Sequence, residues 1–217
     1  MTMGFLELLG SMLSEGLIIT VVTTLLSALL ALVLGFIAGL MRMSKNKFVR
    51  FLVGIYVEVF RGTSLLVQLF WIYFVLPMFG ITMSALTAAV LTIGLNYGAY
   101  TSEVVRSGIE SVDQGQYEAG VALNFTRWQR MRRIILPQAF VLMIPNLGNQ
   151  LIELFKSTSL VSLITLTDLT YQANVLNATT LQTTEIYIAL LIIYFILAWP
   201  LTKGMDILER KMTEGRM

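Results

Sequence analysis

Long apolar runs, separated by short polar or charged stretches, dominate the sequence. Residues 16–41 are 26 consecutive uncharged positions, and a helix rising about 1.5 Å per residue crosses the roughly 30 Å hydrocarbon core of a bilayer over that length. Further apolar runs cover residues 51–76, 83–102, 134–167 and 186–202. The pattern predicts an all-α integral membrane protein with about five transmembrane helices.

Two of these runs carry internal irregularities. The run 51–76 is interrupted by Glu58 and Arg61 and is followed by a Pro-Met-Phe-Gly turn signal, and the small polar residues 62–64 indicate a kink. The run 134–167 is too long for one straight crossing. Because residues 145–148 contain both a proline and a glycine, we expect this segment to break there.

The basic residues give the orientation. Thirteen of the fifteen Lys and Arg residues fall between the first and second runs, between the third and fourth, or after the fifth: Arg42, Lys45, Lys47, Arg50, Arg106, Arg127, Arg130, Arg132, Arg133, Lys203, Arg210, Lys211 and Arg216. The positive-inside rule therefore predicts an external N-terminus and a cytoplasmic C-terminus. The first fifteen residues contain Glu7, Glu15 and no base, unlike a cleaved leader, so we expect the first run to remain a span.

Composition narrows the function further. Mean hydropathy is +0.77, 56% of residues are hydrophobic and the net charge is only +2, which favours a bilayer environment and no nucleic-acid partner. With neither cysteine nor histidine, the chain has no thiolate nucleophile, imidazole base or Cys/His metal site. We expect one transmembrane domain over residues 1–217, with no catalytic residue, no metal and no cofactor of its own.

Charged pairs occur within or beside the apolar runs at i,i+3 spacing, which places both partners on one helical face. They are Glu58 with Arg61, Glu103 with Arg106, and Glu153 with Lys156. Mutual neutralisation is one expectation for all three pairs, because an unpaired charge at membrane depth is costly.

The third pair also fits a second interpretation, the lining of a solute pathway. It follows the expected helix break and has polar neighbours, as the sites of membrane carriers do. An α-amino acid carries both charges, so a nearby carboxylate and ammonium would each supply a counter-charge. The pathway candidates are Asn149, Glu153, Lys156, Ser157 and Thr158, with Arg61 near the expected kink as a further one.

The longest predicted cytoplasmic connection contains an unusual segment at about residues 114–137. Small residues at positions 119, 120 and 122 allow close approach of another surface to a short helix, and Tyr117, Leu123 and Trp128 offer apolar anchors. The alternative is a surface helical hairpin whose basic end touches lipid headgroups.

The same segment resembles the EAA loop of type I ATP-binding-cassette (ABC) importer permeases. Glu118-Ala119-Gly120, three residues, Asn124, nine residues and then Ile134-Ile135-Leu136-Pro137 follow that family's pattern. Gly120 replaces the usual alanine, and Asn124 replaces the usual glycine at what we expect to be a left-handed turn, which asparagine also tolerates. Residues 58–68, 100–116 and 149–163 are similar to the polar amino acid branch, and the type I core spans about residues 17–206.

The resemblance implies the type I permease fold and an importer in the bacterial inner membrane for polar amino acids or amino-acid-like solutes. It also implies partners: ABC ATPase subunits, a second permease, identical or homologous, and an extracytoplasmic binding protein. In that family the EAA segment couples to the ATPase, a role we assign to Glu118, Ala119, Gly120 and Asn124. The sequence has no phosphate-binding Gly-x-x-x-x-Gly-Lys-Ser/Thr loop, so ATP and Mg²⁺ are expected on the partner ATPase.

A different class of transporter remains as the alternative. An ion-coupled secondary carrier of small polar solutes would use an intramembrane carboxylate such as Glu153 for protons and would need no ATPase. The EAA-like segment separates the two hypotheses, because such a carrier has no ATPase to bind.

Overall fold

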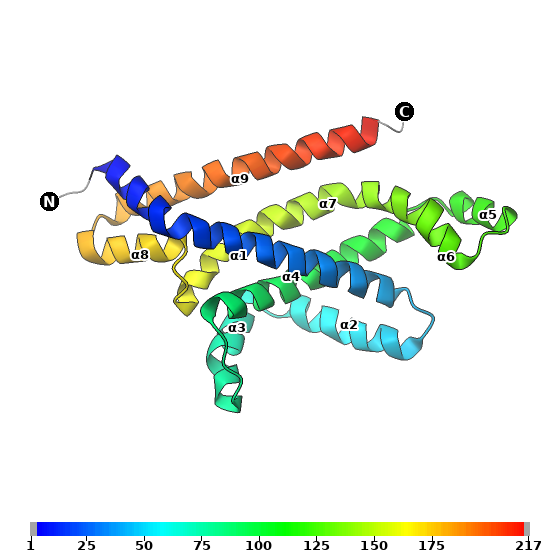
Figure 1. The fold of residues 1–217 in the computed structure, drawn as a ribbon, viewed down its shortest axis with the longest axis horizontal. Helices are drawn as coiled ribbons and strands as arrows, with labels where there is room; N and C mark the ends of the chain where they lie inside the picture. The colour runs from blue at the N-terminus through cyan, green and yellow to red at the C-terminus, as the bar shows by residue number, and fades with distance from the viewer. Residues whose placement is uncertain (1–3, 215–217) are drawn as a thin grey trace.

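The computed structural model describes residues 4–214 and, within that range, consists of helices and connecting turns without any strand. Four long helices follow the long axis of the molecule: α1 (Phe5–Arg42), α4 (Ala85–Glu110), α7 (Leu136–Ser157) and α9 (Thr183–Glu214) (Figure 1). Figure 1 also shows the shorter helices α5 (Gln114–Ala122) and α6 (Arg127–Arg130) at one end of this bundle, and α8 (Leu169–Thr180) at the other. The all-α expectation is confirmed over the described residues.

Helices α1 and α4 pack closely because small residues line their contact. A Cβ atom on Gly39 would lie 2.7 Å from the side chain of Val105, and one on Gly94 would lie 2.6 Å from that of Leu30. Small residues at such contacts bring helix backbones together, which is how helices associate in a lipid environment. These two helices therefore form the central pair of the bundle, and α7 and α8 pack against them.

Helix α2 (Lys47–Gly62) ends at a sharp break. The segment that follows, α3 (Leu65–Phe70) with the short helices η1 (Trp71–Val75) and η2 (Leu76–Phe79), is inclined by 105° to α2 and projects from the bundle (Figure 1). Side chains replace the backbone partners lost at the break, since Gln68 Nε2 and Asn96 Nδ2 both donate to the Phe60 carbonyl, at 2.9 and 2.8 Å. The kink expected at residues 62–64 is confirmed, but residues 51–76 do not form one continuous helix.

The fourth apolar run breaks at a different place from the one we expected. Pro145 lies inside the continuous helix α7, whereas the chain leaves the α-helix at η4 (Thr158–Ile164) and reverses at Thr165, whose φ is 63°. Gly148 contacts Met205 of α9, so a neighbouring helix packs against α7 just beyond the proline. The prediction of a break at residues 145–148 is therefore wrong, because proline is tolerated in a membrane helix that packs against others.

The far end of the bundle is held by α8. Asp168 caps this helix by accepting from the Thr170 and Tyr171 backbone amides, and the Leu169 amide donates to Thr20 Oγ1 at 3.2 Å. A Cβ on Gly16 would lie 2.7 Å from the Leu169 backbone, so glycine is needed where α1 meets α8. The predicted external connection thus contains a helix docked on α1.

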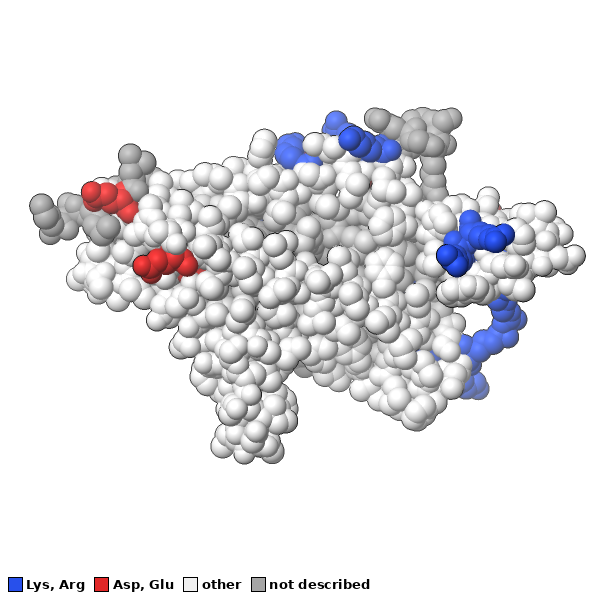
Figure 2. Space-filling model, in the orientation of Figure 1, with Lys and Arg blue, Asp and Glu red and all other residues white. Residues whose placement is uncertain are grey.

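Among the described residues, three helical segments are long and apolar enough to cross a membrane: Glu7–Arg42, Arg127–Ile164 and Thr183–Met212. The bent pair Lys47–Gly62 and Leu65–Phe79 adds a fourth if it counts as one span. Helix α4 has the length, at 26 residues, but is not among these segments. On the face drawn in Figure 2, Lys and Arg extend from the middle of the molecule to the end near α5 and α6, and the visible Asp and Glu lie near α8. Five spans with an external N-terminus remain a prediction.

Candidate functional site

Helix α7 carries a line of exposed polar side chains that we call the polar stripe. It consists of Asn146, Asn149, Glu153 and Lys156, spaced by three or four residues and therefore on one helical face. Among residues 4–214, neither Glu153 nor Lys156 takes part in an ion pair. The expectation that these two neutralise each other is wrong, and both charges are left to face groups outside the chain.

Three of the predicted pathway residues lie off the polar stripe: Arg61, which is described below, Ser157 and Thr158. Ser157 is half-buried, its hydroxyl donates to the Glu153 carbonyl at 2.9 Å, and it lies 2.6 Å from the Tyr97 hydroxyl. Thr158 is fully buried and donates to the Phe155 carbonyl at 2.7 Å. Ser157 therefore ties α7 to α4, and Thr158 stabilises the start of η4 rather than lining an exposed surface.

Lys156 borders a crevice of about 710 Å³ between α7 and α9. Tyr187, Tyr194 and Trp199 of α9 form its aromatic wall, and Ser159 and Thr170 add hydroxyl groups. Such a mixture of aromatic surface with a few polar groups is typical of small-molecule sites. Sequence reasoning missed the contribution of α9 to this crevice, because its aromatic residues have the pattern of ordinary membrane-facing positions.

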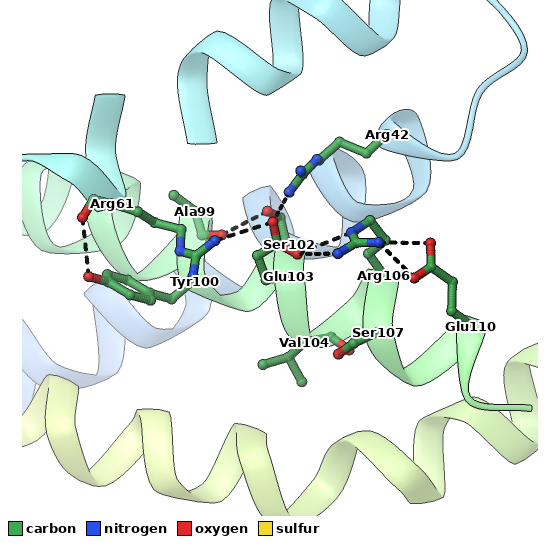
Figure 3. Close-up of polar contacts among 10 residues, drawn as sticks. All are labelled: Arg42, Arg61, Ala99, Tyr100, Ser102, Glu103, Val104, Arg106, Ser107 and Glu110. Atoms are coloured by element: carbon green, nitrogen blue, oxygen red, sulfur yellow. Dashed lines mark hydrogen bonds and ion pairs between the residues drawn. The ribbon is translucent and has the colours of Figure 1, made fainter. Parts of the chain in front are cut away.

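A second group of charges lies where α1, α2 and α4 meet, and we call it the rim cluster (Figure 3). It consists of Arg42, Arg61, Glu103, Arg106 and Glu110. Glu103 Oε1 contacts Arg42 and lies 3.2 Å from Arg61, while its Oε2 lies 3.0 Å from Arg106. Arg106 also contacts Glu110 at 2.6 Å. The predicted Glu103 and Arg106 pair is confirmed.

Glu58 and Arg61 do not pair with each other, contrary to expectation. Arg61 contacts Glu103, and its guanidinium lies over the Tyr100 ring, 5.2 Å from the ring centroid. Glu58 is exposed and makes no ion pair among the described residues, although it borders a cavity of about 420 Å³ with Arg50. Arg61 is therefore held on α4, and no described ion pair or hydrogen bond connects its side chain to the polar stripe.

The EAA-like segment forms the short helix that its sequence indicates. Asp113 caps α5 by accepting from the Gly115 amide at 2.6 Å, and Asn124 ends it with a φ of 53°, the left-handed conformation expected at that position. Glu118 and Ala119 are exposed on α5. Leu123 and Trp128 follow it with exposed fractions of 64% and 68%, so two of the three expected apolar anchors are free to meet a partner.

Gly120 and Tyr117 instead face the rest of the chain. A Cβ on Gly120 would lie 2.6 Å from the Arg130 side chain and 3.1 Å from that of Ile134, so its small size serves packing within the chain. Tyr117 donates to the Ile109 carbonyl at 3.3 Å, and partial burial, with Glu110 nearby, raises the pKa of its phenol. In this structure both residues contact the same chain, and a contact of Gly120 or Tyr117 with a partner stays a prediction.

No group of three or more acidic side chains among residues 4–214 is arranged to hold a metal ion.

Comparison with known proteins adds the family. The family model described as "Binding-protein-dependent transport system inner membrane component" matches residues 31–214. A protein of Sinorhizobium fredii named "Probable amino-acid ABC transporter permease protein y4tF" is 43% identical over 94% of this chain and 88% of its own length. The L-cystine transport system permease TcyB of Bacillus subtilis is 41% identical over 92% of this chain and 86% of its own.

Solved structures agree on the fold. A chain of an amino acid ABC transporter crystallised with histidines superposes with a TM-score of 0.90 at 37% identity, covering 97% of this chain and all of the other. A chain of the MetNI methionine ABC transporter gives a TM-score of 0.80 at 19% identity, which supports the fold alone. The type I permease fold is confirmed, and the protein belongs to the inner membrane components of binding-protein-dependent ABC transport systems.

Proposed function

We propose that this chain is the membrane-spanning permease subunit of an ATP-driven importer of polar amino acids or amino-acid-like solutes. The family supports a transport role without chemistry on the chain, and relatives of similar length are named for amino-acid, cystine and glutamine transport. Their substrates differ, so the proposal concerns the class of solute and not one amino acid.

The observation that carries the proposal is the polar stripe. An exposed carboxylate and an exposed ammonium on one face of an apolar helix are costly against lipid, and neither has an ionic partner within the described chain. A zwitterionic amino acid offers each of them a counter-charge. We assign Asn149, Glu153 and Lys156 to the pathway, with Ser157 behind them.

Energy comes from a separate ATPase in this proposal, and ATP and Mg²⁺ bind there. The surface offered to that partner is the exposed side of α5 with the residues that follow it, including Glu118, Ala119, Leu123 and Trp128. Asn124 shapes the turn, and Gly120 keeps α5 against Arg130. A second permease, identical or homologous, and an extracytoplasmic binding protein complete the assembly.

Reconstituted transport tests the proposal. The complex, purified through a tag on this chain, is placed in liposomes with ATP inside, and uptake of labelled histidine, glutamine and cystine is measured with its binding protein outside. We expect uptake of at least one of them that requires ATP and persists when ionophores remove proton and sodium gradients. Uptake that ignores ATP and follows an ion gradient would instead establish the secondary carrier.

A further inference from the structure

The rim cluster forms a continuous ionic path along α4 toward α5. Glu103, Arg106 and Glu110 lie at i, i+3 and i+7 on this helix, and each contacts the next, at 3.0 and 2.6 Å (Figure 3). Glu110 is the last residue of α4, and Asp113 caps α5 three residues later. The path therefore ends directly before the EAA-like segment.

Two other helices are attached to the start of this path. Arg42 is the last residue of α1, and Arg61 lies in the last turn of α2, immediately before the 105° break. Both guanidinium groups reach the same oxygen of Glu103. The Tyr100 hydroxyl donates to the Arg61 carbonyl at 3.5 Å, and its ring lies under the Arg61 guanidinium, so Arg61 is held through both its backbone and its side chain.

The charge balance makes Glu103 the essential member. Three arginines face two carboxylates, which leaves a net charge of +1; without the Glu103 charge it becomes +2, and three guanidinium groups lose their common partner. The Glu103 side chain is only 22% exposed, so water replaces that partner poorly. Repulsion among the three guanidinium groups would then act against the contact between the ends of α1, α2 and α4, which Glu103 bridges.

We propose that Glu103 is a positioning residue that links the break after α2 to the EAA-like segment, so that displacement of α5 by the ATPase reaches Arg61 and the segment of α3, η1 and η2 that follows the break. The proposal rests on the proposed function, because it requires an ATPase that moves α5. It differs from a purely stabilising role in one respect. Loss of the link alters how hydrolysis and transport are coupled, and not only how much complex assembles.

The test compares the wild-type importer, purified with its partners, with the variant Glu103→Gln, which keeps the size of the side chain and removes its charge. The measurement is the number of solute molecules transported per ATP hydrolysed, normalised to assembled complex. We expect this ratio to fall about tenfold, within the usual range for coupling between two sites. The matched control is Asp206→Asn, which breaks the exposed pair with Lys203 on α9 and is expected to leave the ratio unchanged.

A second variant covers the case in which Glu103→Gln assembles poorly. Glu110→Gln breaks only the final step of the path, at a side chain that is 53% exposed, and is expected to give a smaller fall in the same ratio with normal assembly. If Glu103→Gln assembles and transports as many solute molecules per ATP as the wild type, the proposed link is wrong. If Glu103→Gln does not assemble, a wild-type ratio in Glu110→Gln leads to the same conclusion. Absence of ATP-driven uptake by the wild-type complex contradicts the proposed function itself, so the two failures are distinguishable.

Discussion

The rim cluster and the polar stripe both place charged side chains on long helices, yet only the rim cluster is paired within the chain. Glu103 holds three arginines from three helices, whereas Glu153 and Lys156 lie one helical turn apart without contact. Both groups face the same cost of removing charge from water. In the rim cluster, pairing within the chain offsets this cost and fixes the positions of the helices. In the polar stripe, the charges remain available to an external partner.

Topology reporters give an all-or-none test of where these two groups lie in the membrane. A reporter fused after residue 217 should read cytoplasmic, and one inserted after Leu181, which is 81% exposed between α8 and α9, should read external. These results would place the rim cluster toward the cytoplasm, beside the ATPase. The reverse pattern would contradict the five-span arrangement and the role of α5.

Removing the charges of the polar stripe should affect transport more than folding. Glu153→Gln and Lys156→Met should each lower transport per assembled complex by about 10- to 100-fold, because a charge-assisted contact contributes about 1.5–3 kcal/mol. The amount of complex after purification and the uptake rate are measured together. A loss of complex with normal uptake in the surviving fraction would assign these residues to the structure, like the rim cluster.

The docking surface beside the rim cluster can be tested by steric obstruction. Ala122→Trp adds a large side chain at an exposed position of α5 and should weaken ATPase association about tenfold through overpacking, while membrane insertion is retained. Val175→Trp, at an exposed position of α8 on the opposite end, is the control. If equal amounts of the ATPase co-purify with both variants, α5 is not the docking element.

A further prediction concerns thermal stability. Glu103→Ala should lower the free energy of unfolding by about 2 kcal/mol, because three arginines lose their partner in a partly buried site, and the melting temperature by about 4–8 °C. Glu153→Ala should change stability by no more than about 0.5 kcal/mol. Thermal unfolding in one detergent measures both, and equal effects would erase the distinction between the two groups.

Sequence reasoning succeeded where the signal is local. The apolar runs, the helix at the EAA-like segment, the kink after Arg61 and the left-handed Asn124 all follow from neighbouring residues. It failed where distant residues compete for the same group. Arg61 is three residues from Glu58 but binds Glu103, 42 positions away, and no spacing rule for one helix reveals such a contact.

The same limit explains the misplaced break and the orientation of Gly120. Whether Pro145 breaks a helix depends on what packs beside it, and Gly148 contacts Met205 more than fifty residues later. The small size of Gly120 showed that something approaches closely, but not that the approaching group is Arg130 of the same chain. Most of the candidate site depends on which charged side chains pair with each other, and these pairings are tertiary contacts.

Accessibility of the polar stripe tests the central claim most directly. The chain has no native cysteine, so Asn149→Cys introduces a single thiol into it without altering any charge. This thiol should react with a charged, membrane-impermeant thiol reagent in the assembled importer and be protected by the transported amino acid. Ile196→Cys, at an exposed apolar position of α9 that does not line the crevice beside Lys156, should react slowly and without protection. Reaction of residue 149 no faster than residue 196, with no effect of substrate, would contradict a pathway along α7.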